Sequence, residues 1–113
     1  MPPAESRLSP IEYHLLLALA SGEMHGYALR DAIESESRGA VVPRAGTLYR
    51  VVARMMGDGL VREGAGPGEE VRHPGRTRRY YALTALGREA LQEETRRLRL
   101  TMALAERRLR TGG

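Results

Sequence analysis

The sequence predicts a single domain of the α+β class, mainly helical, with three short helices, a two-stranded β-hairpin and a long C-terminal helix. Three observations support this prediction. A capped apolar segment lies near the N-terminus, two β-prone segments flank a glycine-rich segment, and an apolar stripe continues for several helical turns toward the C-terminus. A length of 113 residues is typical of one compact domain.

The first helix is expected over residues 10–20. A second, short helix is expected after Met24–Tyr27, on the spacing of Ala28, Leu29, Ala32 and Ile33, with its end near Ser35 to Gly39. Ser9 and Glu12 flank Pro10 with the spacing of a capping box, and proline is favoured at the first helical position. Apolar residues then recur at steps of three and four in both segments, which indicates two amphipathic helices.

A third helix is expected from about Thr47 to Met56, before Gly57-Asp58-Gly59 ends it. Its apolar residues share one face, and they are Leu48, Val51, Val52 and Met55. Glycine costs about 1 kcal/mol relative to alanine inside a helix, so the end of this helix is expected to fray or to expose Met56.

Residues 60–63 and 78–83 are β-prone and flank Gly64–Gly68, which predicts a hairpin with a flexible tip. Such a hairpin beside three helices is a wing. Tyr80 and Tyr81 alternate along the second strand, so one ring should face the core and the other should face away.

A helix capped by Thr84 is expected to run to about Leu109. The apolar stripe on this helix repeats at steps of seven, four, three and four, through Leu91, Leu98, Met102, Ala105 and Leu109. One small domain cannot easily cover so long a helix, so these residues predict a dimer; docking of the stripe on the chain's own core is the alternative. Residues 1–83 would then form one domain and residues 84–113 a dimerisation helix.

Positive charge is concentrated in the middle of the chain, where residues 41–82 hold eight arginines and four acidic residues. A basic segment suggests a polyanionic partner, and a solvated basic face is the alternative. All 18 basic residues are arginine, which suits bidentate contacts to phosphate and guanine. A codon bias toward G and C would give the same composition.

Several classes of function are disfavoured by the sequence. Cysteine is absent, and the three histidines, His14, His25 and His73, are far apart, so neither a metal nor another cofactor is expected. Motifs for a nucleophile, a nucleotide loop or paired acids are missing, which argues against an enzyme. The longest apolar stretch is too short to span a bilayer, and residues 1–6 lack the apolar part of a signal peptide, so a cytoplasmic protein without a membrane partner is expected.

Three helices followed by a hairpin form the order of a winged helix-turn-helix, in which the third helix enters the major groove and the wing contacts the DNA backbone. The candidate contacts to double-stranded DNA are Arg44, Thr47, Tyr49, Arg50, Arg54, Arg76 and Arg78. Thr47 could instead cap the helix, the Tyr49 ring could pack against the second helix, and the arginines could form a solvated face.

Four motifs together resemble the PadR family of bacterial transcriptional regulators. They are His25-Gly26-Tyr27-Ala28-Leu29, Gly46-Thr47-Leu48-Tyr49, Gly59-Leu60-Val61, and Arg79-Tyr80-Tyr81-Ala82-Leu83-Thr84 with Gly87. The resemblance implies a repressor that dimerises through its C-terminal helix and binds an operator with dyad symmetry. The short segment after Gly87 is similar to the compact subgroup with one C-terminal helix.

The chain also departs from the family pattern. A serine-proline pair usually precedes the Gly46–Tyr49 motif and a proline follows it, whereas this chain has Arg44-Ala45 and then Arg50. These differences bear on the operator sequence more than on the fold.

Regulators of this family commonly respond to small aromatic or cationic molecules. An effector site is expected between the first helix and the partner's C-terminal helix, lined by Ile11, Leu15, Leu98 and Met102. The chain has neither tryptophan nor phenylalanine, so stacking on a flat ligand would depend on tyrosine. A protein-binding adaptor and an RNA-binding winged helix remain the alternatives.

Overall fold

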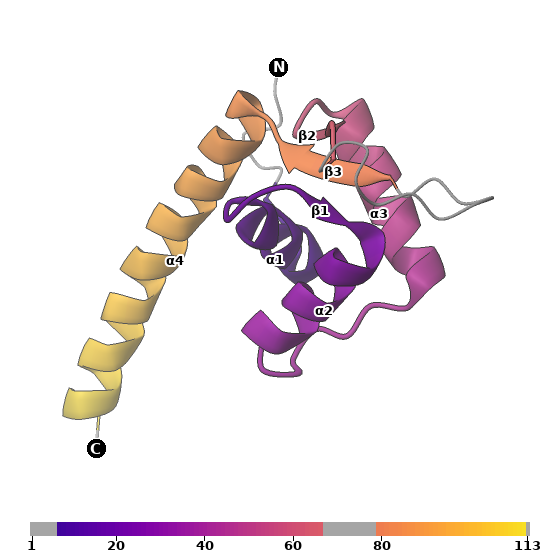
Figure 1. Cartoon of the computed structure of the whole chain (residues 1–113). Coiled ribbons are helices and arrows are strands. Elements are labelled where there is room, and N and C mark those ends of the chain that lie inside the picture. The colour runs from indigo at the N-terminus through magenta and orange to yellow at the C-terminus, as the bar shows by residue number, and fades with distance from the viewer. Residues whose placement is uncertain (1–6, 67–78, 113) are drawn as a thin grey trace.

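A computed structural model describes residues 7–66 and 79–112. The described elements, in chain order, are α1 (Pro10–Leu19), β1 (Met24–His25), α2 (Gly26–Glu36), α3 (Ala45–Gly57), β2 (Val61–Glu63), β3 (Tyr80–Leu83) and α4 (Ala85–Thr111). The first three helices and the sheet form one body, and α4 begins beside β3 and runs away from that body (Figure 1). The mainly helical winged architecture predicted from the sequence is confirmed.

The sheet has three strands in the order β1-β3-β2, all antiparallel, where the sequence predicted two. Met24 and His25 pair with Tyr81 and Tyr80 as the added strand, and α2 begins directly after them at Gly26. A strand of two residues is too short to show alternation in the sequence. Its hydrogen bonds to β3, which is distant in sequence, decide its conformation.

The core lies between α1, α2, α3 and the inner face of the sheet. Its fully buried large side chains are Leu15, Leu16, Leu29, Ile33, Leu48 and Met55. Tyr81 is buried while Tyr80 is half-buried, as the alternation predicted. Met56, expected to be exposed, packs against this core, and α3 continues through Gly57, so the prediction of a frayed end was wrong.

Two predicted caps are present. The Ser9 hydroxyl accepts a hydrogen bond from the Glu12 backbone N–H at 3.3 Å, and the Glu12 carboxylate accepts one from the Ser9 N–H at 2.8 Å. The Thr84 hydroxyl accepts from the Gly87 N–H at 2.9 Å and donates to the Gly59 carbonyl at 2.6 Å. Thr84 therefore joins the start of α4 to the turn after α3.

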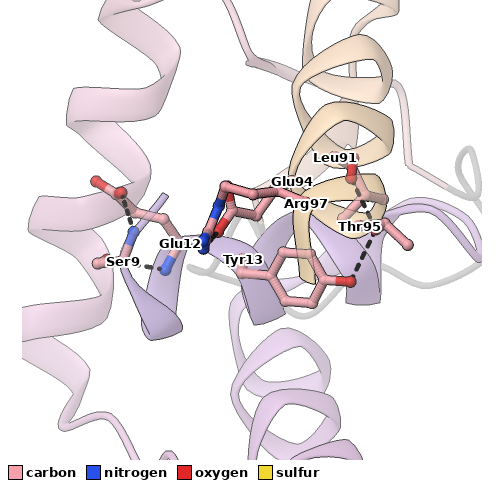
Figure 2. A network of polar contacts seen from close by, with 7 residues as sticks. All are labelled: Ser9, Glu12, Tyr13, Leu91, Glu94, Thr95 and Arg97. Carbon is pink, nitrogen blue, oxygen red and sulfur yellow. Dashed lines mark hydrogen bonds and ion pairs between the residues drawn. The ribbon is translucent and has the colours of Figure 1, made fainter. Parts of the chain in front are cut away.

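The first half of α4 packs on its own protomer. Gly87 lies so close to the Leu60 carbonyl that an added Cβ would stand 2.1 Å from its oxygen, and Leu91 belongs to the core cluster. The Thr95 hydroxyl donates to the Leu91 carbonyl at 2.7 Å and therefore accepts from the Tyr13 hydroxyl at 2.8 Å (Figure 2). These contacts fix the direction in which α4 leaves the body.

The buried Glu94 and the Arg97 guanidinium form an ion pair in the same region (Figure 2). Hydrogen bonding from Arg97 lowers the pKa of Glu94 below its ordinary value, against the opposing effect of burial. None of the helices in residues 7–66 and 79–112 is both long enough and apolar enough to cross a membrane.

Candidate nucleic-acid interface

The third helix presents an apolar face to the core and a polar face to the surface. Its buried residues are the four that the spacing predicted, namely Leu48, Val51, Val52 and Met55. Arg44, Arg50 and Arg54 are exposed on the other side of the helix. An amphipathic helix of this kind can offer its cationic side to an anionic partner while the domain holds the opposite side.

The N-terminus of α3 is not closed by its own side chain. The helix begins at Ala45, two residues earlier than expected, and its cap residue Arg44 makes no side-chain hydrogen bond to the first turn. Thr47 is therefore inside the helix, and the interpretation of this residue as the cap was wrong. Its hydroxyl lies 3.4 Å from an Arg50 guanidinium nitrogen, which donates to it.

Tyr49 packs against α2 and is also partly exposed. The side chain is 50% exposed, and its phenol end lies against Gly26 at the start of α2. A Cβ atom at Gly26 would come within 2.7 Å of the Tyr49 hydroxyl. Glycine at this position therefore leaves room for the ring, which keeps the hydroxyl near the junction of α2 and α3.

Arg54 has a partner within the protein. Its guanidinium bonds the Glu12 carboxylate, which belongs to the capping box of α1, so this ion pair joins α1 to α3. Burial raises the pKa of Glu12, whereas the Ser9 N–H and Arg54 lower it by a larger amount. The pKa of Glu12 therefore lies below its ordinary value. The Arg54 side chain remains 56% exposed.

The connection between α2 and α3 depends on a residue that the sequence analysis did not single out. Arg30 donates from Nε to the Pro43 carbonyl at 3.0 Å and so fixes the segment immediately before α3. Tyr27 was also missed as a surface residue; it is 66% exposed in the first turn of α2. The family motif around Tyr27 was visible in the sequence, but the short α2 pattern did not show which of its residues face outward.

The wing is only partly described. Arg76 and Arg78, the two predicted wing contacts, lie outside the described residues, as does His73. Arg62 on β2 and Arg79, immediately before β3, are exposed. Gly64, read from the sequence as part of a flexible tip, donates its N–H to the Tyr80 carbonyl at 2.7 Å, and the Gly66 N–H donates to the Glu23 carboxylate at 3.0 Å.

The residues expected at a dimer or effector interface separate into two groups. Leu91 is buried in its own core and Leu15 is fully buried, so neither side chain is available to a partner or a ligand; both assignments are corrected. Ile11 and Leu98 are half-buried, while Met102, Ala105 and Leu109 are exposed. Among the described residues, no three histidine, aspartate or glutamate side chains gather in a group that could hold a metal ion.

Comparison with known proteins decides the family. The model of the transcriptional regulator PadR-like family matches residues 15–93, which include the second half of α1, all of α2, α3 and the sheet, and the first part of α4. The chain belongs to the PadR-like family. Its members are transcriptional regulators rather than enzymes. The family resemblance inferred from the four sequence motifs is confirmed.

One curated relative also matches most of the chain. An uncharacterized 37.1 kDa protein of transposon Tn4556 from Streptomyces fradiae is 41% identical over 88 residues, which are 78% of this chain and 23% of that protein. The chain thus spans less than a quarter of the length of the curated relative it matches.

Solved PadR-like structures share the fold. A PadR-like transcription factor from Bacteroides fragilis is 26% identical, with a TM-score of 0.65 over 85% of this chain and 87% of that one. Bacillus subtilis PadR, solved in complex with operator DNA, is 17% identical, with a TM-score of 0.62 over 75% of this chain and 46% of that chain.

Proposed function

We propose that this PadR-like chain is a homodimeric repressor that binds a dyad-symmetric operator in double-stranded DNA through α3. The outer face of α3 carries the proposal, because Arg44, Tyr49 and Arg50 are exposed there beside an N-terminus whose backbone N–H groups have no side-chain cap. Guanidinium and hydroxyl donors next to free backbone N–H groups can bind phosphate and base edges.

The geometry of the described residues suggests different roles for the predicted contacts. Arg50 is exposed, and its one side-chain hydrogen bond to the described residues is the long bond to Thr47. It can therefore turn toward a base edge without loss of a strong partner among them. Arg54 already neutralises Glu12, so in our proposal it contacts phosphate with its exposed part while it holds α3 on α1. Arg44 lies at the helix start, where a phosphate is also attracted by the helix dipole.

The dimer in this proposal forms through residues 84–113, with residues 1–83 as the DNA-binding domain. The stripe that buries Leu91 in the body continues on the same side of α4 to Met102 and Leu109, which are 60% and 79% exposed. A two-fold packing of these helices would bury the stripe and place two α3 helices on one face. Half-sites would then be separated by about one turn of DNA or a multiple of it.

The proposal is tested by measuring how the purified protein binds the promoter DNA of its own gene, with fluorescence anisotropy at several salt concentrations. We expect salt-sensitive binding that selects the promoter over random DNA. Arg50→Ala should weaken binding to the selected site on the order of tenfold, as expected for a lost base contact.

Arg107→Ala is the matched control, because it removes the same charge from an exposed position on α4. Its binding should stay within about twofold of the unmodified protein, the size of a general electrostatic effect. Equal binding to random DNA would instead favour a protein-binding adaptor, and preference for RNA in competition would favour an RNA-binding winged helix.

We further propose that a small-molecule effector releases the operator from a site between α1 and the partner's α4, in the cytoplasm where the DNA is located. Ile11 is half-buried on α1. Leu98 and Met102 lie on the apolar stripe of α4, toward the part of the helix that extends beyond the body. A thermal-shift screen of small aromatic acids and cationic dyes tests this part. A ligand that raises the unfolding temperature should also weaken promoter binding.

A further inference from the structure

We propose that Glu23 is a positioning residue for the wing: its carboxylate fixes the end of β2 relative to β1 and α2, and through it the orientation of the wing on DNA. This inference rests on the proposed function, since it concerns how the same interface is held. Glu23 lies immediately before β1, whereas the residues that it contacts follow β2, more than forty positions later in the chain.

The carboxylate of Glu23 lies against two glycines. One oxygen accepts the Gly66 backbone N–H at 3.0 Å. At Gly64 an added Cβ would stand 2.6 to 2.8 Å from the carboxyl carbon and both oxygens of Glu23, so the carboxyl group occupies the space that a side chain would fill. A residue other than glycine at position 64 would displace the carboxylate.

The opposite side of this turn is also restrained. Gly66 has a φ of +78°, a conformation that favours glycine, and an added Cβ would come within 2.9 Å of the Tyr80 ring. The Tyr80 ring meets the His25 ring edge to face at a centroid distance of 5.5 Å, and His25 accepts the Ala28 N–H as the cap of α2. The turn after β2 is therefore joined to α2 as well as to the sheet.

Charge alone predicts the opposite effect for Glu23. A carboxylate beside a DNA-binding wing repels phosphate, so its loss should strengthen binding to any DNA. If instead the carboxylate holds the wing in the orientation that contacts DNA, its loss should weaken binding to the selected site. The sign of the change therefore separates a positioning role from a purely electrostatic one.

The test compares Glu23→Ala, Glu23→Gln and Glu63→Gln in anisotropy measurements on promoter and random DNA. Glu23→Ala should weaken promoter binding by about fivefold, the loss expected for one hydrogen bond, and should reduce the ratio of promoter to random binding. Glu23→Gln keeps an acceptor oxygen for Gly66 and should restore most of that ratio. Glu63→Gln removes a charge from β2, where the Glu63 carboxylate makes no hydrogen bond or ion pair to the described residues, and should not weaken binding.

Promoter binding by Glu23→Ala that equals or exceeds that of the unmodified protein would overturn the proposal, as would equal losses in Glu23→Ala and Glu23→Gln. The amide signal of Gly66 in nuclear magnetic resonance spectra gives a second test in the free protein. It should change position in Glu23→Ala relative to the unmodified protein and change much less in Glu23→Gln, while the signals of α3 stay unchanged in both variants. A Gly66 amide that does not respond would also overturn the proposal, whereas failure of the unmodified protein to select DNA would overturn the proposed function.

Discussion

The two halves of α4 carry the same apolar stripe but lie in different surroundings. In the first half, Gly87 and Leu91 are buried against the protomer's own body, and Thr95 is tied to Tyr13 on α1. In the second half, every residue from Thr101 to Gly112 is exposed. A continuous helical pattern can thus serve two purposes, because the body is long enough to cover only the first half. The first half anchors the helix, and the second half is left uncovered by the described part of the chain; in our proposal a second copy covers it.

The largest expected difference between the halves comes from shortening one leucine in each. Leu91→Ala should lower the free energy of unfolding by about 2–5 kcal/mol, because it leaves a cavity in the core. Leu109→Ala should leave the stability of an isolated protomer unchanged and raise only the dissociation constant of the dimer. Chemical denaturation at several protein concentrations, with sedimentation, separates the two effects. A concentration-independent loss of stability in Leu109→Ala would contradict the division.

The next largest change in stability is expected from two glycine-to-alanine substitutions, one in α4 and one in α3. Gly87→Ala should destabilise the protein by about 1–3 kcal/mol, because the new methyl group would meet the backbone carbonyl of Leu60, which cannot easily move. Gly57→Ala at the end of α3 has open space around it and should stabilise the protein by up to about 1 kcal/mol through helix propensity. Thermal unfolding of both variants would measure the opposite signs. Destabilisation by Gly57→Ala would show that propensity is not the deciding factor.

A smaller effect is expected from the hydrogen bond between α1 and α4. Tyr13→Phe should cost about 1 kcal/mol, since it removes the hydroxyl that donates to Thr95 and leaves the Thr95 bond to Leu91 intact. Thr95→Val should cost a similar amount. The double variant should cost less than the sum of the two, which a double-mutant cycle would reveal. Additive costs would mean that the two hydroxyls do not act on each other.

The smallest effect is confined to acid pH. Because Arg97 lowers the pKa of Glu94 in the folded chain, the stabilisation by Glu94 is complete above its unfolded pKa of about 4.5 and is lost as the pH falls through the lower folded value. Glu94→Gln should therefore reduce the dependence of stability on pH below about 4.5, with little change in that dependence at neutral pH. Urea unfolding as a function of pH measures this. If Glu94→Gln left the dependence of stability on pH unchanged in acid, the role of the ion pair would be contradicted.

The helices were predictable because their signals are local. Ser9 and Thr84 act as caps in the structure as their sequence context predicted, and the buried face of α3 follows the spacing of Leu48 to Met55. The two-residue β1 was not predictable, because it pairs with β3, which is distant in the sequence. Met56 was misassigned for a related reason, since its packing depends on the core around α3 and not on the local sequence.

The candidate interface was predictable in outline only. The exposed Arg44, Tyr49 and Arg50 follow from the pattern of α3. The ion pair of Arg54 with Glu12 joins residues 42 positions apart, and the contact of Glu23 with Gly66 joins residues 43 positions apart. No periodicity or motif reports such pairs, since either carboxylate is compatible with a solvated surface.

The sequence by itself determined the family, the helical periods, the caps and the cationic character of α3, because each depends on residues within a few turns of one another. Only the tertiary structure decided how much of α4 the body covers and which arginine of α3 pairs with a carboxylate. It also decided why glycines stand at positions 64 and 66, after β2. These features depend on close contacts between distant segments. The physical reason is that burial and hydrogen bonding depend on residues that are distant in the sequence and become neighbours only in the folded chain. A local sequence pattern contains no information about such neighbours.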